Sequence, residues 1–319
     1  MDKKLISIVT PTFNEAENIE ELCQRIEKTM QGFSGKYDYE HIIIDNCSTD
    51  KTVELASKLA KKNSSIKIIV NVRNFGPVRS PYYGVINAYG DAVVLMAADL
   101  QDPPELLAKY LKKWEEGFDV VLAAKPKSVE LAVMRTIRKT FYRLLNLISE
   151  VPLENNATGA GLFDKKVVDC LRKIPDPYPY FRGLICDLGF TRCTIDFVQP
   201  ARKRGYSKAS IYGMFDQAFL AMTKHSKVPL RLMTLLGMLF GFLALLLSLI
   251  FFVLKIIYWN SFSLGIAPLL IAFFFFAGVQ FFFLGILGEY IGSILTHIRG
   301  MPLVIENKRI NFSDEVEKK

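Results

Sequence analysis

Short apolar segments rich in β-branched residues alternate with amphipathic segments through the first third of the chain. This alternation predicts strands joined by helices, which form a parallel sheet with helices on both faces. The predicted strands are Leu5–Thr10, His41–Asp45, Ile66–Asn71 and Ala92–Ala97, and the predicted helices are Ala16–Met30, Lys51–Lys62, Val78–Tyr89 and Pro104–Glu116. The fold class expected here is a doubly wound, Rossmann-like α/β domain.

Two much longer apolar runs lie near the C-terminus. Met233–Leu254 has 22 residues without a charge and Ile256–Gly288 has 33, and about 20 apolar residues are enough for a helix to cross a bilayer. Basic side chains flank the pair on both sides, at Lys224, Lys227, Arg231, Arg299, Lys308 and Arg309. Because positive flanks stay inside, we expect a two-helix transmembrane hairpin in a multi-pass protein of the cell membrane, with the N-terminal domain in the cytoplasm.

A third apolar pattern lies between the domain and the hairpin. Apolar residues recur there at helical spacing, at Ile211, Met214, Phe215, Ala218, Ala221 and Met222. The pattern fits either an amphipathic helix in the inner membrane interface or a helix packed on the domain. The expected organisation is a cytoplasmic domain (1–208), a juxtamembrane amphipathic segment (209–230), two transmembrane helices (231–298) and a cytoplasmic tail (299–319).

Composition agrees with a membrane location. Half of the residues are hydrophobic, the mean hydropathy is +0.22 and the net charge is +8. Beside a bilayer, positive charge favours lipid headgroups and phosphorylated substrates, and since no nucleic-acid-binding motif accompanies it, nucleic acid is not an expected partner. Five cysteines without C-x-x-C spacing argue against a zinc site. The three histidines are expected at surfaces or interfaces rather than in catalysis: His41, His225 and His297.

Loops after the predicted strands are the expected ligand site, because doubly wound sheets bind ligands beyond the carboxyl ends of their strands. These loops are Pro11–Glu15, Asp45–Asp50, Arg73–Gly76 and Ala98–Asp102. Neither G-x-G-x-x-G after the first strand nor G-x-x-x-x-G-K-[ST] is present, which argues against a dinucleotide enzyme and against a P-loop.

The last of these loops is acidic. Asp99 follows a predicted buried strand, where a carboxylate must be hydrated, paired or bound to a metal. Mg²⁺ takes one or two protein carboxylates and completes its octahedron with substrate phosphates and waters. Asp99, with the Gln101 carbonyl as a second ligand, is therefore a candidate metal site on a diphosphate. Asp102 is expected mainly to cap a helix that begins at Pro103.

Six short motifs occur in order along nearly the whole chain: VTPTFNE (Val9–Glu15), DNCSTDKT (Asp45–Thr52), RNFG (Arg73–Gly76), DLQDPPE (Asp99–Glu105), RKRGYSK (Arg202–Lys208) and LGEYIG (Leu287–Gly292). Together they resemble glycosyltransferase family 2, specifically its polyprenyl-phosphate glycosyltransferases of the dolichol-phosphate mannose synthase and bactoprenol glucosyltransferase types. The resemblance implies a glycosyltransferase A fold, a divalent metal (Mg²⁺ or Mn²⁺) and inverting transfer of a sugar from a nucleotide-sugar, a UDP-sugar being favoured.

The resemblance also implies roles for individual residues. Asp99 is the expected catalytic residue and, with Gln101, would face the metal and the diphosphate. The remaining donor residues, which would line the nucleoside pocket, are Pro11, Phe13, Glu15 and Asp45. The residues expected near the acceptor phosphate are Arg202, Ser207 and Lys208.

The expected acceptor is polyprenyl phosphate. Its second pKa of ~6 leaves it largely dianionic at neutral pH, so a strong general base is not needed. Basic side chains would screen the phosphate, either in Arg202–Lys208 or in a second cluster that fits a solvated helix face equally well: Arg135, Arg138, Lys139 and Arg143. Membrane lipid is a further expected partner, and a homo-oligomer is compatible with the sequence.

The chain departs from the family pattern at two places. Ala97 occupies the position of the first aspartate of the usual D-x-D, and Thr158–Leu162 replaces a G-D-F-R-like segment. Because Ala97 removes one expected metal ligand, an inactive membrane scaffold that binds nucleotide-sugar without turnover is an alternative function. A processive polysaccharide synthase is the other alternative, although such enzymes carry more spans and a Q-x-x-R-W motif, which is absent here.

Overall fold

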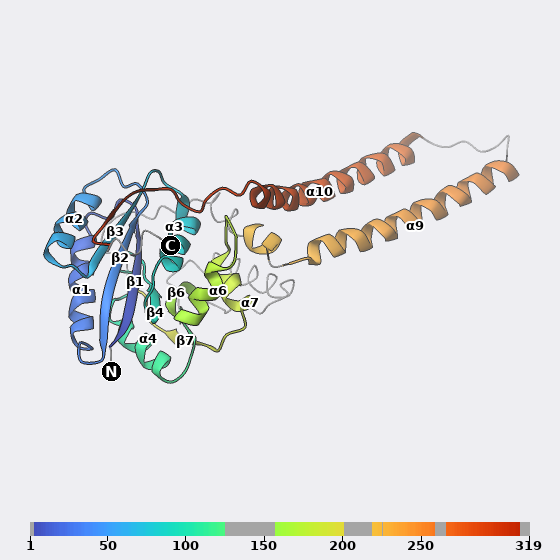
Figure 1. The fold of residues 1–319 in the computed structure, drawn as a ribbon. Helices are drawn as coiled ribbons and strands as arrows, with labels where there is room; N and C mark the ends of the chain where they lie inside the picture. Colours follow the sequence, from blue (N-terminus) through green and yellow to red (C-terminus); the bar gives the residue numbers. More distant parts are fainter. Residues whose placement is uncertain (1–2, 125–156, 201–218, 225, 259–265, 313–319) are drawn as a thin grey trace.

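The computed structural model describes residues 3–124, 157–200, 219–224, 226–258 and 266–312. It contains a sheet domain and two long helices that extend away from it (Figure 1).

The sheet has eight strands in the described part of the chain, in the order β7-β5-β6-β4-β1-β2-β3-β8. Its centre is parallel and consists of β1 (Lys4–Thr12), β2 (Tyr37–Asp45), β3 (Ile66–Asn71) and β4 (Ala92–Leu95). These four strands confirm the predicted doubly wound core. The sheet continues beyond β4 with β5 (Val120–Ala124), β6 (Ala157–Asp164) and β7 (Arg192–Asp196). Because β6 runs antiparallel between β4 and β5, the complete sheet is mixed.

Helices cover both faces of the sheet (Figure 1). One core lies under α1 (Ile19–Gln31), α2 (Thr52–Lys62) and α4 (Leu106–Glu115). The other lies under α3 (Gly76–Ile86), α6 (Lys165–Arg172) and α7 (Phe181–Asp187). Side chains alternate along the strands, so that Ile8 belongs to the first core and Val9 to the second. Burial on both faces explains why these strands are nearly continuous apolar runs.

The start of α4 differs from the prediction. Pro103 was expected as the first helical residue with Asp102 as its cap, whereas α4 begins at Leu106 and Glu105 occupies the cap position. The reason is Pro104, which disfavours helical backbone at the residue before it. Glu105 makes no capping hydrogen bond; its carboxylate accepts hydrogen bonds from Arg25 at 2.6 and 3.0 Å.

The two long helices are α9 (Val228–Ile257) and α10 (Ile266–Ile298), and both are long and apolar enough to cross a membrane. α10 ends ten residues beyond the uncharged run predicted from the sequence, because Glu289 does not end the helix. Large apolar side chains cover their surface, and Phe281 on α10 is 73% exposed. Apolar surface of this extent needs lipid or protein to cover it.

The segment predicted as a tail contributes a strand. β8 (Glu306–Ile310) pairs antiparallel with β3 at the edge of the sheet. Asn311 fixes its end by donating hydrogen bonds to the carbonyls of Ala60 and Ile66, at 2.7 and 2.9 Å. The chain therefore returns to the sheet domain after the helical hairpin.

His41 is a buried residue of β2, not the surface or interfacial residue expected from the sequence. Its side chain lies between strand and helix, 3.0 Å from the Thr10 hydroxyl and 3.7 Å from the Cys23 sulfur. Burial lowers the pKa of His41 from 6.5 to about 3, because a charged imidazole in this place would lose its hydration.

This burial predicts a pH dependence of stability. The unfolded chain takes up a proton near pH 6.5 that the folded chain excludes down to about pH 3, so the stabilisation is complete above pH 6.5 and is lost as the pH falls. Between pH 7 and pH 5 we expect the unfolding free energy of the wild type to fall by about 2 kcal/mol more than that of His41→Gln.

Chemical denaturation in detergent, followed by Trp114 fluorescence in a Trp259→Phe background, measures both free energies. Equal slopes against pH in the two proteins would contradict the buried, neutral histidine.

Candidate functional site at the carboxyl edge of the sheet

Four loops leave the sheet at its carboxyl edge. Thr12, the last residue of β1, pairs with Asp45, the last residue of β2, and Asp45 pairs with Val70 near the end of β3. β4 joins from the other side, where Leu95 pairs with Val9. The register therefore brings together the loops that the sequence predicted as a ligand site.

Asp45 organises the loop that follows it. Its side chain is buried and accepts hydrogen bonds from the Ser48 hydroxyl (2.5 Å), the Ser48 N–H (2.8 Å) and the Thr12 hydroxyl (3.3 Å). Donors to both carboxylate oxygens hold the side chain in one orientation. The side chain predicted to contact the nucleoside thus also fixes the shape of the loop.

The first two loops are bonded to each other. Asn14 has a positive φ of 54°, and its side-chain oxygen accepts the Thr49 N–H at 2.8 Å. The Glu15 N–H donates to the Thr52 hydroxyl at 2.8 Å. Pro11, Phe13 and Glu15 are half-buried. Because Thr12 pairs with Asp45, the structure places these three predicted donor residues close to Asp45 at the ends of β1 and β2.

Asp50 adds a charged contact to the same connection. Partial burial acts to raise the pKa of its carboxyl, but hydrogen bonds from the hydroxyl and N–H of Thr52 and from the Ala16 N–H hold that pKa below its ordinary value. The carboxylate therefore stays charged at neutral pH and closes the loop onto the start of α1.

Asn46 joins the second loop to the third. Its Oδ1 accepts hydrogen bonds from the Phe75 N–H (2.8 Å) and the Asn71 amide (3.1 Å), and its Nδ2 donates to Asn74 Oδ1 (2.8 Å) and the Gly76 carbonyl (3.2 Å). One buried amide thus makes four hydrogen bonds. Asn46 was not singled out from the sequence, where its only signal is that it is a polar residue between a predicted buried strand and a polar loop.

The fourth loop carries Asp99. Its Oδ1 accepts the Gln101 N–H at 3.1 Å, and Leu100 between them has a positive φ of 57°. Leu100 itself is buried, while Asp99 and Gln101 are half-buried. The apolar side chain therefore anchors a tight turn that presents a carboxylate and a main-chain carbonyl at the sheet edge.

The metal-ligating side chains at this edge fit only one type of metal site. The described residues contain no group of three or more histidine, cysteine, aspartate or glutamate side chains arranged to hold an ion. Asp99 alone suits a hard cation such as Mg²⁺ whose other ligands come from water and a bound phosphate. The site therefore fits an ion most of whose coordination comes from a bound phosphate and water rather than from protein side chains.

Two arginines follow β3 near the same edge. The Arg73 guanidinium lies 4.0 Å from the centre of the Phe75 ring. Arg79, in the second turn of α3, lies 5.3 Å over the Tyr178 ring, and its Nε is buried without a hydrogen-bond partner within the described ranges. A guanidinium with an unused donor near the carboxyl edge of the sheet is a candidate for contact with an anion.

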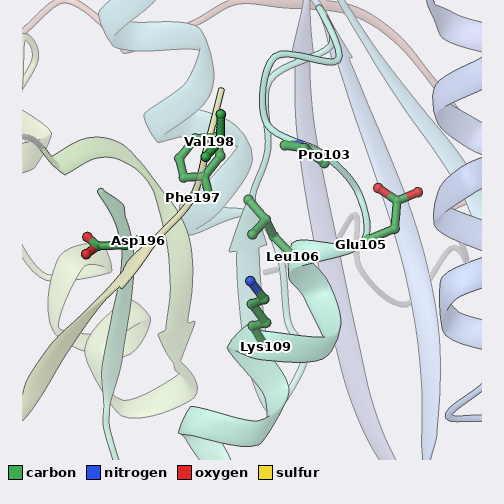
Figure 2. A pocket seen from close by; sticks show the side chains of 7 residues that line it. All are labelled: Pro103, Glu105, Leu106, Lys109, Asp196, Phe197 and Val198. Atoms are coloured by element: carbon green, nitrogen blue, oxygen red, sulfur yellow. The ribbon is translucent and has the colours of Figure 1, made fainter. Parts of the chain in front are cut away.

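A pocket of about 410 Å³ lies beside the acidic turn, between the start of α4 and the end of β7 (Figure 2). Pro103 and Glu105 from the DLQDPPE motif line one side, and Asp196 and Phe197 line the other. The predicted nucleoside residues are not in its lining, so this pocket is separate from the loop cluster around Asp45.

The predicted acceptor-phosphate residues fall outside the described ranges: Arg138, Arg202, Ser207 and Lys208. Most of the predicted juxtamembrane helix does so too. Residues 219–224 are helical, with Leu220 and Ala221 buried, so the described end of that segment packs on the protein.

Residues 7–171 match glycosyl transferase family 2. An uncharacterized glycosyltransferase of Synechocystis sp. is 32% identical over 301 residues, which cover 94% of this chain and 94% of the relative. The bactoprenol glucosyl transferase of Shigella phage SfII is 30% identical over 306 residues, which cover 95% of this chain and 97% of the relative. Matches of this length include both long helices as well as the sheet domain.

Among solved structures, a mannosyltransferase from Pyrobaculum calidifontis in complex with GDP-Man and Mn²⁺ is similar at 17% identity and a TM-score of 0.46, covering 93% of this chain and 88% of that one.

The Asn46 hub predicts a specific loss of order in the loop cluster. Asn46→Asp keeps the acceptor oxygen Oδ1 but replaces the donating amide nitrogen with a second oxygen, so that Asn74 Oδ1 and the Gly76 carbonyl face a carboxylate. We expect the unfolding free energy to fall by about 1–3 kcal/mol and hydrogen exchange at the Phe75 and Gly76 amides to accelerate.

Asn63→Asp is the matched control, because the good hydrogen bond of Asn63 uses its side-chain oxygen as the acceptor, from the Ser65 N–H at 2.9 Å. Equal effects of the two substitutions would show that Asn46 does not hold the loops together.

Proposed function

The chain belongs to glycosyl transferase family 2, and we propose that it transfers a sugar from a nucleotide-sugar to polyprenyl phosphate at the cytoplasmic face of the cell membrane. It is a glycosyltransferase with a Rossmann-like glycosyltransferase A domain. The observation that carries the proposal is the joining of this domain to a hairpin of two exposed apolar helices. The relative named bactoprenol glucosyl transferase, similar over nearly the whole chain including this hairpin, supports a polyprenyl acceptor.

The donor side is assigned to the loop cluster. We propose that Pro11, Phe13, Glu15 and Asp45 line the nucleoside pocket, with a UDP-sugar as the favoured donor. Asp99 and the Gln101 carbonyl would hold a divalent metal on the diphosphate. When bound, such an ion supplies Lewis-acid stabilisation to the departing nucleoside diphosphate.

Arg79 is proposed as a second source of positive charge for the diphosphate. It was not identified from the sequence. Its unused Nε–H and its place at the carboxyl edge support contact with an anion. In a chain that has Ala97 in place of one expected aspartate, a fixed guanidinium would compensate for weaker metal binding by offering preorganised donors to the leaving group.

The acceptor phosphate would act as its own nucleophile. One phosphate oxygen forms the new bond to the anomeric carbon as the bond to the nucleoside diphosphate breaks on the opposite face, which inverts the configuration. The phosphate is already dianionic at neutral pH, so no protein base has to remove a proton. We assign the screening of its charge to Arg202, Ser207 and Lys208, with Arg138 in the alternative basic cluster.

A donor screen tests the proposed function. The purified full-length protein is incubated with labelled nucleotide-sugars and polyprenyl phosphate, and the lipid extract is analysed. We expect a single-sugar, phosphate-linked glycolipid from one donor. A polymeric product would instead establish a processive synthase, and nucleotide-sugar binding without any product would establish an inactive scaffold.

The assignment of Asp99 predicts a large, metal-linked loss of rate. Asp99→Asn removes the one carboxylate assigned to the ion, and we expect the metal-dependent transfer rate to fall by about 100-fold or more. Initial rates against Mg²⁺ concentration measure the effect. Asp187→Asn, at an exposed aspartate that ends α7, is the control. Full metal-dependent turnover by Asp99→Asn would place the ion elsewhere.

A further inference from the structure

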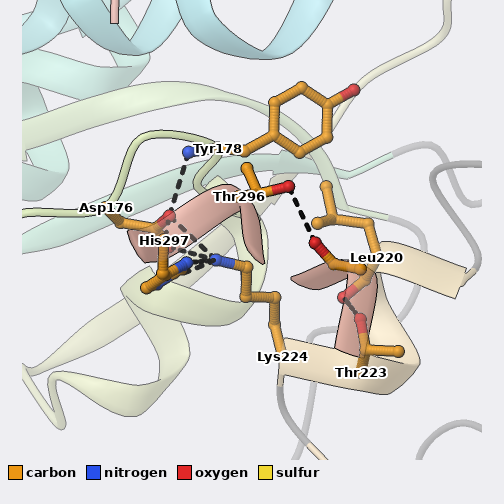
Figure 3. A network of polar contacts seen from close by, with 8 residues as sticks. Asp176, Tyr178, Leu220, Thr223, Lys224, Thr296 and His297 are labelled. Carbon is orange, nitrogen blue, oxygen red and sulfur yellow. Dashed lines mark hydrogen bonds and ion pairs between the residues drawn. The ribbon is translucent and has the colours of Figure 1, made fainter. Parts of the chain in front are cut away.

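Side chains from three separate parts of the chain meet where the hairpin joins the sheet domain (Figure 3). Asp176 follows α6 in the sheet domain, Lys224 precedes α9, and His297 lies in the last turn of α10. The Lys224 ammonium lies 2.8 and 3.0 Å from the two carboxylate oxygens of Asp176 and 3.2 Å from each ring nitrogen of His297. Asp176, Lys224 and His297 form a joint between the hairpin and the sheet domain.

The ion pair of the joint is buried. The side chains of Lys224 and Asp176 are only 12% and 8% exposed, while His297 covers them from outside at 44%. Asp176 is held from its own side as well, because its Oδ1 accepts the Tyr178 N–H at 2.9 Å. A buried charge whose partner is removed is strongly unfavourable, so the pair favours one docked arrangement over alternatives in which the two parts separate.

The helices of the hairpin have a fixed register near the joint. The Tyr290 hydroxyl donates to the Ser226 carbonyl at 2.7 Å, and further along the pair Phe240 packs against Phe275 and Phe276. With Ser226 beside Tyr290, the last part of α10, about two turns, extends past the start of α9. This extension carries His297 to the sheet domain.

The joint also contacts the element that leads to the loop cluster. Tyr178, two residues after Asp176, lies under the Arg79 guanidinium of α3. α3 begins at Gly76, whose carbonyl is bound by Asn46. A continuous path of contacts therefore links the end of α10 with the loops that hold the donor in the proposed function.

We propose that Asp176, Lys224 and His297 are positioning residues that hold the donor loops at the height of the lipid phosphate above the bilayer. This inference rests on the proposed function. A phosphate attached to an embedded polyprenyl tail stays near the headgroup plane, so the catalytic domain must be held at a fixed distance from that plane. Small misplacements of the reacting groups are costly to rate. The joint is the described contact where all three parts of the chain meet.

The test compares one acceptor in two surroundings. Undecaprenyl phosphate is presented to the full-length enzyme in lipid vesicles, where its phosphate is confined to a plane, and in detergent micelles, where it is not. For Asp176→Asn we expect kcat/KM in vesicles to fall by about tenfold or more while the value in micelles stays within about twofold of the wild type.

Two further variants sharpen the result. Asp119→Asn breaks another aspartate–lysine pair of the sheet domain, with Lys166 at 2.5 Å, in which the aspartate is 12% exposed and the lysine 56% exposed. This variant is expected to leave the vesicle-to-micelle ratio unchanged. The double variant Asp176→Lys/Lys224→Asp exchanges the two charges and is expected to recover part of the vesicle-to-micelle ratio that Asp176→Asn loses. It is the test to use if the Asp176→Asn variant does not fold.

The outcomes separate the two proposals. A wild type that binds nucleotide-sugar but glycosylates undecaprenyl phosphate in neither surrounding overturns the proposed function. A wild type that is active in both, with an Asp176→Asn variant that loses activity equally in both or behaves like Asp119→Asn, overturns the positioning role of the joint.

Discussion

The parallel pairing of β1 with β2 and β4 is the constraint on which the site depends. It ends β1 and β2 together, with Thr12 beside Asp45, and ends β4 three residues earlier, with Leu95 beside Val9, so that the polar loops that follow lie at one edge. Because side chains alternate between the two faces, a slip of one residue would exchange the residues of the two cores and move Asp45 off its partners. The cores above and below the sheet therefore specify the geometry of the site as well as the stability of the domain.

Beyond the ends of the strands, hydrogen bonds of polar side chains rather than apolar packing hold the structure together. Asp45 and Asn46 are both buried; the Asp45 carboxylate bonds Ser48 of its own loop, and the Asn46 amide bonds residues of the loop after β3. Buried polar groups that are satisfied in this way rigidify their surroundings. In the proposed function these residues act on the donor chiefly through the shape of the loops, while Asp99 and Arg79 offer charge.

The sequence was most informative where local pattern and tertiary structure agree. The β-branched runs of β1 to β4, buried on both faces, were predicted within a few residues. β6 was not predicted because its sequence, ATGAGLFD, has the composition of a loop. Its glycines are needed because the neighbouring strand is close: a Cβ on Gly161 would lie 2.2 Å from the Val121 carbonyl. β8 was not predicted because its sequence, ENKRI, is charged and half-exposed at the edge of the sheet. Asp99 and Asp45 could be found from motifs, whereas the hub at Asn46 and the joint at Asp176 depend on residues far apart in the chain.

The return of the chain to the sheet through β8 has a consequence for how the protein is made. β8 is synthesised after both apolar helices, yet it covers the edge of β3, a strand near the beginning of the chain. Until β8 leaves the ribosome, β3 presents an unpaired edge of the kind that invites pairing with other chains. The sheet domain can thus be completed only after the hairpin has been translated, so that synthesis of both apolar helices precedes the closing step of folding.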